Sequence, residues 1–298
     1  MVKQEPWPGR VYSELGLLLR PGYADAKHLA PLYERLHKAI RAVDNDTIIL
    51  CMFFLCLLSF PFFFLLSSHN TKQTLLVLLL DEPHVSTSQV LPFSAGFETG
   101  PGGPDYDDRQ AFAFHHYCPT VDAGGAPTNE FYCDWFADRS FETRVVDSER
   151  LGGGSFLTEW GSFSTNPAAL NEFNTISALA DKFLISWAHW GYEHIHSLAL
   201  DSFLTHTYAR STAGIPVSME FNTETATFQY VYSASTATTN SETEIYLRES
   251  LWYPSGFAVT LSPSTIGRWA RVSQNIIVVT QAADVADGTI ITITIKRT

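Results

Sequence analysis

The feature that most constrains the fold is a change in hydrophobic periodicity at about residue 214. Before this point, short apolar runs at residues 47–50 and 183–187 alternate with amphipathic segments. In residues 24–43, apolar side chains recur at spacings of three and four, which predicts a helix. A second helix is predicted from Asn166-Pro167 to about residue 182, because Asn caps helices and Pro suits the first helical position. Alternating strands and helices predict an α/β domain with a parallel sheet over residues 1–213.

After residue 214, apolar and polar residues alternate with a period of two. Clear examples are residues 227–232 and residues 291–295, and a turn signal at Asp287-Gly288 separates two such runs. Alternation of this kind is typical of half-buried strands. We therefore expect residues 214–298 to form a small antiparallel β-sandwich.

Residues 48–66 carry no charge and are crowded with Phe and Leu. On hydropathy alone this stretch qualifies as a membrane-spanning helix of about 20 residues. Pro61 interrupts it, its first residues continue a predicted strand, and the nearest downstream basic residue is Lys72. Three interpretations stay open: translated intron sequence (favoured, because Phe, Leu, Ser and Pro share pyrimidine-rich codons), a membrane segment, or a buried insertion. We treat residues 51–80 as an atypical apolar insertion.

Composition narrows the function. The formal net charge is −12 and no basic stripe is present, so nucleic acid is not an expected partner. Abundant aromatic residues with an excess of carboxylates favour sugar binding. The four cysteines match no zinc site, and no metal or organic cofactor is implied. Cys118 and Cys133 flank a polar loop, where a disulfide and two free thiols are both compatible with the sequence.

Two carboxylates are placed as glycoside hydrolysis requires. Glu159 ends a short apolar run and is followed by Trp160 and Gly161, while Glu5 lies in a Gln-Glu-Pro-Trp motif. On two strands of one sheet, one carboxylate can attack the anomeric carbon and the other can protonate the leaving oxygen. Each motif alone is weak, and Glu82 is a rival acid. The ordered pair, with His-His-Tyr between its members, is a much stronger signal.

This order resembles retaining glycosidases of glycoside hydrolase family five, and further motifs are similar to endoglycoceramidase-related enzymes. The segments that carry the resemblance are residues 5–9, 32–37, 97–104, 114–118, 156–161, 186–190, 244–246 and 253–257. The resemblance implies the C-terminal half of a (β/α)₈ barrel, followed by the β-sandwich. Because Glu5 lies so near the start, we expect an N-terminally truncated barrel. Open strand edges would then impair folding and turnover.

The resemblance also implies residue roles. Glu159 would be the nucleophile and Glu5 the general acid/base, kept protonated by burial and by the nearby Glu159 charge. Tyr117 would hydrogen-bond the nucleophile, and His115 would face the first sugar subsite. Trp187 or Trp190 would stack on the sugar. Gln4 stands where the family has an Asn, which weakens one expected contact with the sugar.

The predicted function is hydrolysis of the sugar–lipid bond of glycolipids such as glycosylceramides, with retention of configuration. The expected partners are a glycolipid substrate and the membrane surface that presents it, and the expected location is secreted or membrane-associated. The alternatives are a steryl β-glucosidase, a non-catalytic glycolipid-binding protein and a single-pass membrane protein.

Overall fold

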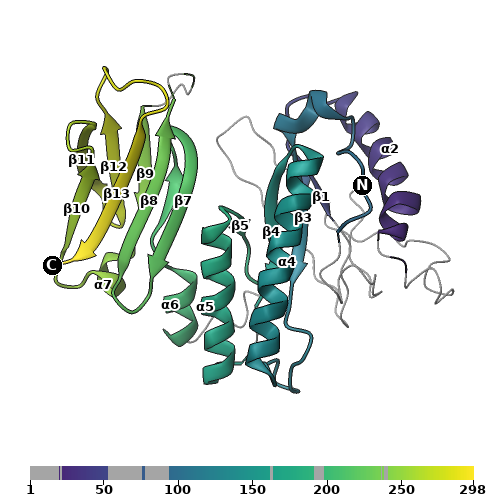
Figure 1. The fold of residues 1–298 in the computed structure, drawn as a ribbon, viewed down its shortest axis with the longest axis horizontal. Helices are drawn as coiled ribbons and strands as arrows, with labels where there is room; N and C mark the ends of the chain where they lie inside the picture. Colours follow the sequence, from purple (N-terminus) through teal and green to yellow (C-terminus); the bar gives the residue numbers. More distant parts are fainter. Residues whose placement is uncertain are drawn as a thin grey trace. The chain divides into compact units, whose positions relative to one another are not determined.

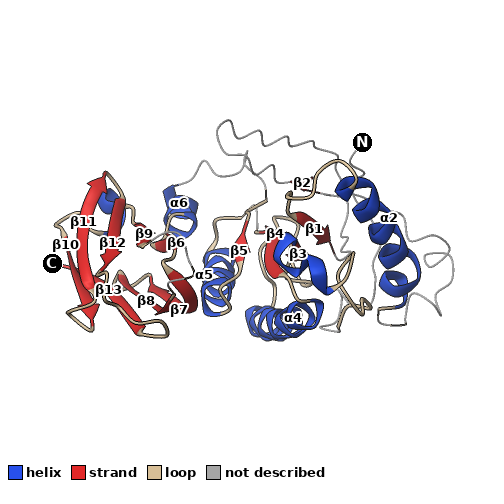
Figure 2. Ribbon diagram, turned by 90° about the horizontal axis from the view of Figure 1, so that it is seen from above, coloured by secondary structure: helices blue, strands red, loops and turns tan. Residues whose placement is uncertain are grey.

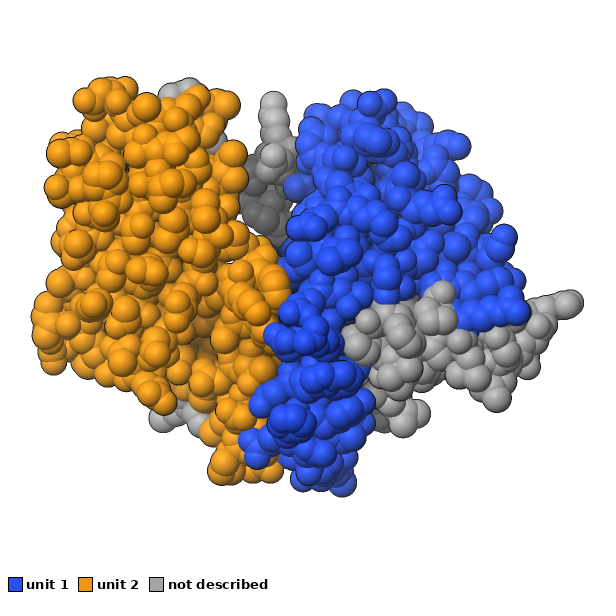
Figure 3. All heavy atoms as spheres, viewed as in Figure 1, with its two compact units in different colours: residues 1–161, 185–190 blue, residues 162–184, 191–298 orange. Residues whose placement is uncertain are grey.

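The computed structural model describes residues 20, 22–52, 76–77, 94–161, 164–190, 198–235, 237 and 241–298. These residues form two compact units, coloured separately in Figure 3. The first unit comprises residues 1–161 and 185–190, and the second comprises residues 162–184 and 191–298. The chain therefore passes from one unit to the other three times.

The first unit contains a five-stranded, wholly parallel sheet in the order β2-β1-β3-β4-β5 (Figures 1 and 2). Its strands are β1 (Ile49–Met52), β2 (Leu76–Val77), β3 (Gln110–His116), β4 (Gly154–Trp160) and β5 (Ser186–Trp187). Its helical elements are the π-helical turn η2 (Asp25–Leu29), α2 (Ala30–Arg41), the 3-10 helix η3 (Pro104–Arg109) and α4 (Glu130–Leu151). The predicted parallel α/β sheet and the predicted helix at residues 24–43 are confirmed. Strand β2 lies outside β1, so it departs from the sequential order of the other four strands.

Strand β3 separates two apolar faces. Phe112 and Phe114 are buried on one face, where Phe114 meets Phe141 of α4 at 5.6 Å between ring centroids. On the other face, Ala113 packs with Leu50, and partly buried Phe156 joins them. Because side chains alternate along a strand, His115 belongs to the Ala113 face and His116 to the α4 face.

Helix α4 is not among the elements expected from the periodicity of the sequence. Its N-cap Asn129 accepts a hydrogen bond from the Tyr132 N–H, and Gly152 ends it in the left-handed conformation at φ 82°. Its buried side includes charged residues, Arg144 and Asp147, as well as apolar ones. This mixture removes the single apolar stripe by which an amphipathic helix is recognised.

The second unit is a β-sandwich with two helices ahead of it. Its sheets have the strand orders β10-β13-β8-β7 and β11-β12-β9-β6, and all pairs are antiparallel. The elements are α5 (Pro167–Lys182), α6 (Leu198–Leu204), β6 (Tyr208–Ser211), β7 (Gly214–Asn222), β8 (Thr227–Ala234), β9 (Glu242–Tyr246), α7 (Glu249–Trp252), β10 (Phe257–Ser262), β11 (Gly267–Ser273), β12 (Ile276–Gln281) and β13 (Ile290–Arg297). Inward-facing aromatic and β-branched residues of both sheets, such as Phe228, Ile245 and Ile293, form one core.

Two predicted boundaries need correction. The sandwich begins at β6, before residue 214, because Tyr208 and Ala209 pair with β9. The predicted strand at residues 183–187 is reduced to Ser186–Trp187, because Leu184 adopts φ 55° in a turn that follows α5. The start of α5 is as predicted, since Asn166 caps it by accepting from the Ala169 N–H at 2.9 Å.

Helix α5 packs against the sandwich within the second unit. The Thr223 hydroxyl, next to β7, donates to the Asn174 side chain at 3.2 Å. His206 lies 3.5 Å from the Asp181 carboxylate, and its ring lies 5.8 Å from that of Phe221. Burial raises the pKa of Asp181 and lowers that of His206 to about 4.

Within the residues that the structure describes, no helix has the length and apolar character needed to cross a bilayer. Of the apolar stretch at residues 48–66, only residues 48–52 are described, and they enter strand β1. Residues 53–66, and most of the suspected insertion at 51–80, lie outside the described residues.

Candidate active site

A β-bulge in strand β4 aligns Glu159 with His115. Phe114 pairs with Leu157, but His115 pairs with Glu159, so Thr158 is an extra residue on β4. The Thr158 hydroxyl donates to the Phe114 carbonyl at 3.1 Å, which holds the bulge in place. Bulges of this kind re-aim a side chain. Here the bulge brings the Glu159 carboxylate to the carboxyl end of the sheet beside His115.

Two donors converge on one oxygen of Glu159. The Tyr117 hydroxyl donates to Oε2 at 3.2 Å, and Nδ1 of His115 lies 3.3 Å from the same oxygen. The Glu159 side chain is 22% exposed, whereas that of His115 is 3% exposed. The structure thus brings together three of the six predicted site residues, as expected for residues that end neighbouring parallel strands.

His115 acts as a neutral donor in this arrangement. Burial lowers its pKa to about 3, so the imidazole is uncharged at ordinary pH and the contact is a hydrogen bond rather than an ion pair. A carboxylate can only accept, so Nδ1 carries the proton. Nε2 is then an acceptor, and it is buried without a hydrogen-bond partner in the described part of the chain.

The loop after Tyr117 is tied to helix α4. Cys118 and Cys133 form a disulfide, with their Cα atoms 5.1 Å apart. The sequence is compatible with either a disulfide or two free thiols at these positions, and the structure has the disulfide. On the other side of Tyr117, the His116 ring lies 5.5 Å from Phe136 of α4.

The tryptophans lie around the end of strand β4. Trp187 is half-buried and meets the buried Trp160 ring edge-on, with centroids 5.1 Å apart. The Trp190 N–H donates to the Trp160 carbonyl at 2.9 Å. Gly161 adopts φ 133°, and a Cβ there would lie 2.4 Å from Nε2 of His189. Trp187 and Trp190 are therefore close to the strand end that carries Glu159, and their contact with a sugar stays a prediction.

The second predicted carboxylate, Glu5, and its rival Glu82 lie outside the described residues. In the described segments, no cluster of three or more His, Cys, Asp or Glu side chains could hold a metal ion.

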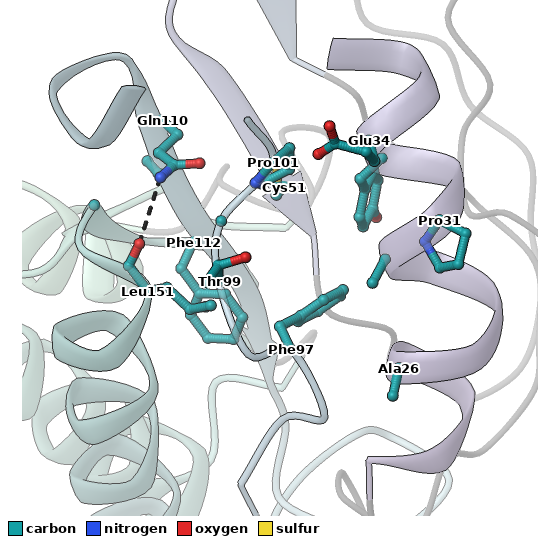
Figure 4. Close-up of a pocket in the computed structure, with 15 residues that line it drawn as sticks. Ala26, Pro31, Glu34, Cys51, Phe97, Thr99, Pro101, Gln110, Phe112 and Leu151 are labelled. Atoms are coloured by element: carbon teal, nitrogen blue, oxygen red, sulfur yellow. Dashed lines mark hydrogen bonds between the residues drawn. The ribbon is translucent and has the colours of Figure 1, made fainter. Parts of the chain in front are cut away.

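A cavity of about 290 Å³ lies elsewhere in the first unit, between helix α2 and the sheet (Figure 4). It is lined mainly by apolar side chains, including Pro31, Phe97 and Phe112, and by Gln110, whose Nε2 donates to the Leu151 carbonyl at 3.4 Å. Gln110 begins β3, so the cavity is at the amino end of the strands, opposite to Glu159. Its position excludes it as the site of the chemistry described above.

Chemically, the described part of the site can hold an ionised carboxylate in one orientation. Two neutral donors on Oε2 favour the charged form without introducing a competing charge. Sequence reasoning named Thr158 and Trp160 only as motif neighbours of Glu159. It did not predict that Thr158 forms the bulge that orients Glu159, or that the Trp160 ring packs against Trp187. A one-residue bulge leaves no periodic signal, and Trp160 is indistinguishable from a core residue by pattern alone.

Comparison with known proteins shows that the chain is similar to endoglycoceramidases. Residues 207–295 match the glycoside hydrolase family 5 C-terminal domain. The chain is 25% identical over 295 residues to an endoglycoceramidase from Cyanea nozakii, which covers 92% of this chain and 49% of that protein. It is 27% identical over 276 residues to an endoglycoceramidase from Hydra vulgaris, covering 87% of this chain and 44% of the relative. The chain thus spans about half the length of these curated relatives.

The fold is also similar to that of a solved endoglycoceramidase. Endo-glycoceramidase II from Rhodococcus sp., solved as a complex with ganglioside GM3, superimposes with a TM-score of 0.68 at 20% sequence identity. The match covers 99% of this chain and 57% of the solved chain. The resemblance to endoglycoceramidases predicted from the motifs is confirmed by these matches.

Proposed function

We propose that this chain carries the nucleophile and the general acid/base of a retaining β-glycosidase. The enzyme would cleave the sugar–lipid bond of glycolipids such as glycosylceramides. The observation that carries the proposal is the pair of neutral donors on Oε2 of Glu159 at the carboxyl end of a parallel sheet. Similarity to endoglycoceramidases, and the GM3 complex of one fold neighbour, support the substrate class.

The fold that we propose is the C-terminal half of a (β/α)₈ barrel. In such a barrel, parallel strands adjacent in sequence are neighbours, helices connect them, and the active site lies at their carboxyl ends. Strands β1, β3, β4 and β5 follow this order, with α4 connecting β3 to β4 in the first unit. We assign them to strands five to eight.

In the proposed reaction, Glu159 attacks the anomeric carbon and forms a covalent glycosyl-enzyme. Glu5 protonates the oxygen of the departing lipid alcohol, then removes a proton from the water that releases the sugar. The His115 and Tyr117 donors keep Glu159 ionised and oriented for attack. Trp187 or Trp190 stacks on the sugar ring. Retention requires the carboxyl groups of Glu5 and Glu159 to be about 5–5.5 Å apart.

We further propose that the substrate is met at a membrane surface, in a secreted or membrane-associated setting. The Cys118–Cys133 disulfide supports an oxidising compartment. Treating the expressed protein with a thiol-alkylating reagent before and after reduction tests this. Alkylation of both cysteines in the protein isolated from its native compartment, without reduction, would contradict it.

The decisive test traps the covalent intermediate. A 2-deoxy-2-fluoro β-glycoside with an activated leaving group needs one attack only, so the experiment does not depend on rapid turnover. We expect peptide mapping to place the sugar on Glu159, and Glu159→Gln to reduce labelling by roughly 10⁴-fold or more. Glu142→Gln, at an exposed carboxylate paired with Arg139, is the matched control. Label on another residue would contradict the nucleophile assignment.

Substrate class is tested with fluorescent glycosylceramide and a steryl glucoside as parallel substrates, using binding as well as hydrolysis. Binding of glycosylceramide by both wild type and Glu159→Gln, with no trapping in either, would mean a non-catalytic glycolipid-binding protein. Faster hydrolysis of the steryl glucoside than of glycosylceramide would mean that the lipid part of the substrate is a sterol. An α-configured product in a methanol-transfer assay would exclude retention.

A further inference from the structure

The Tyr117 hydroxyl reaches Glu159 from a piece of backbone that is fixed on both sides to helix α4. Before it, the His116 ring is buried and lies 5.5 Å from Phe136 and 5.8 Å from Phe141. After it, Cys118 is bonded to Cys133, which is fully buried in α4. The residue that touches the carboxylate is thus held between a packed ring and a covalent bond.

The rest of the loop is closed by its own contacts. Asp122 Oδ1 accepts from the N–H groups of Gly124 and Ala126 at 2.8 and 3.0 Å. The Thr120 carbonyl accepts from the Thr128 N–H at 2.8 Å and from its hydroxyl at 3.0 Å. These contacts shape the outer part of the loop, whereas the disulfide closes its base next to Tyr117.

Tyr117 itself is half-buried, so packing alone restrains its ring less than it would a core residue. Its 3.2 Å contact with Oε2 is already long for an O–H donor, for which 2.5–3.0 Å is usual. A small outward movement of the backbone at Cys118 would take the hydroxyl beyond hydrogen-bonding distance. The contact therefore depends on how firmly this backbone is held.

We propose that the Cys118–Cys133 disulfide is a positioning element that keeps the Tyr117 hydroxyl on Glu159, so that reduction of this bond weakens the nucleophile. The inference rests on the proposed role of Glu159 and deepens it. Without the donor, the ionised carboxylate loses a favourable hydrogen bond. The acidic limb of the pH–rate profile for trapping then moves to higher pH, and the protein works at full rate only where disulfides persist.

The test is a double-mutant cycle in which the rate of covalent trapping is measured for each variant and for their combination. We expect Tyr117→Phe to slow trapping by roughly 10- to 100-fold, the range for loss of a hydrogen bond to a charged group. The pair Cys118→Ser/Cys133→Ser should slow it to a similar degree. Adding both cysteine changes to Tyr117→Phe should then cause no further loss beyond about twofold, as residues acting through one contact are non-additive.

A control separates positioning from general loosening of the loop. Asp122→Ala removes two hydrogen bonds from the same loop without touching its base, and should leave the trapping rate and its pH profile unchanged. If the serine pair does not fold, Cys118→Ala/Cys133→Val replaces it, because it fills the buried space with apolar groups. Multiplicative effects of Tyr117→Phe and the cysteine changes would overturn the proposal.

A readout without catalysis distinguishes failure of this inference from failure of the proposed function. In protein labelled with ¹³Cζ-tyrosine, the Tyr117 resonance is the one that Tyr117→Phe removes. We expect Glu159→Gln and the cysteine pair both to shift it, and Asp122→Ala to leave it in place. If no sugar is trapped at all but the resonance behaves this way, the proposed function fails and the positioning role stands. An unmoved resonance in the cysteine variant refutes the positioning role.

Discussion

Replacing the buried Asp147 should lower the free energy of unfolding of the first unit more than replacing a carboxylate on its surface. Asp147 is fully buried in α4. It accepts from Arg144 at 2.8 Å, from Arg150 at 2.6 Å and from the Ala95 N–H at 2.8 Å. The Ser94 hydroxyl also donates to it. The carboxylate thus joins α4 to residues 94–95, far away in the sequence.

The magnitude follows from what Asp147→Ala leaves behind. The Arg144 side chain is 5% exposed and would lose its bonded counterion. Breaking a buried ion pair on one side costs about 3–5 kcal/mol, because a charge stays buried without compensation. We expect Asp147→Ala to fall within this range, because the buried Ala95 N–H loses its acceptor as well. The double change Asp147→Ala/Arg144→Met should recover more than half of this loss, since no charge remains buried.

Urea denaturation followed by tryptophan fluorescence measures the free energy of unfolding, and hydrogen exchange of residues 94–97 and α4 assigns the loss to the first unit. Asp108→Ala is the matched control. Its carboxylate is 76% exposed and pairs with Arg109, so it should cost less than about 1 kcal/mol. If Asp147→Ala falls within 1 kcal/mol of Asp108→Ala, or if the double variant is no more stable than the single one, the reasoning is wrong.

Further predictions concern pH and backbone conformation. Burial raises the pKa of Asp25 from 3.8 to about 7, so the folded state holds a proton that the unfolded state releases. Its contribution to stability is full below pH 4 and is lost as pH rises to about 7, at ~1.4 kcal/mol per pH unit. Asp25→Asn should lack this slope, so the wild-type minus variant difference in urea unfolding should fall by ~1.4 kcal/mol per pH unit between about pH 4 and pH 7; a flat difference would contradict the raised pKa. Gly161→Ala should destabilise by roughly 1–3 kcal/mol through its φ of 133° and its clash with His189. Gly288→Ala, with φ 80° and open space, should cost about 1 kcal/mol in the same thermal unfolding assay, and equal losses would refute the clash.

Local signals in the sequence predicted those parts of the fold that local contacts determine. Asn166 caps α5 as predicted, because the cap is a hydrogen bond to a residue three positions away. The family resemblance implied that Tyr117 would meet Glu159, and the rule that parallel strands end at one edge of a sheet accounts for the observed meeting of His115, Tyr117 and Glu159. That rule needs strand order only, and no knowledge of the packing.

What the sequence could not predict depends on contacts between distant residues or on single backbone angles. Helix α4 is held partly by the buried Arg144–Asp147 pair, which a hydrophobic pattern does not register. The turn at Leu184 replaces the first three residues of the predicted strand 183–187, although these residues are apolar. The bulge at Thr158 inserts one residue into a regular ladder, and its only trace is in the register with β3.

Helix α5 has a consequence for protein engineering and for the comparison of relatives. It follows the strand that carries Glu159, yet it is built into the body of the sandwich through Asn174 and Asp181. A sandwich excised just after His206 would leave the face of β7 that α5 covers open to solvent and therefore prone to aggregation. A chimera that exchanges the sandwich should carry residues 162–184 with it, because these residues and the sandwich form one compact unit.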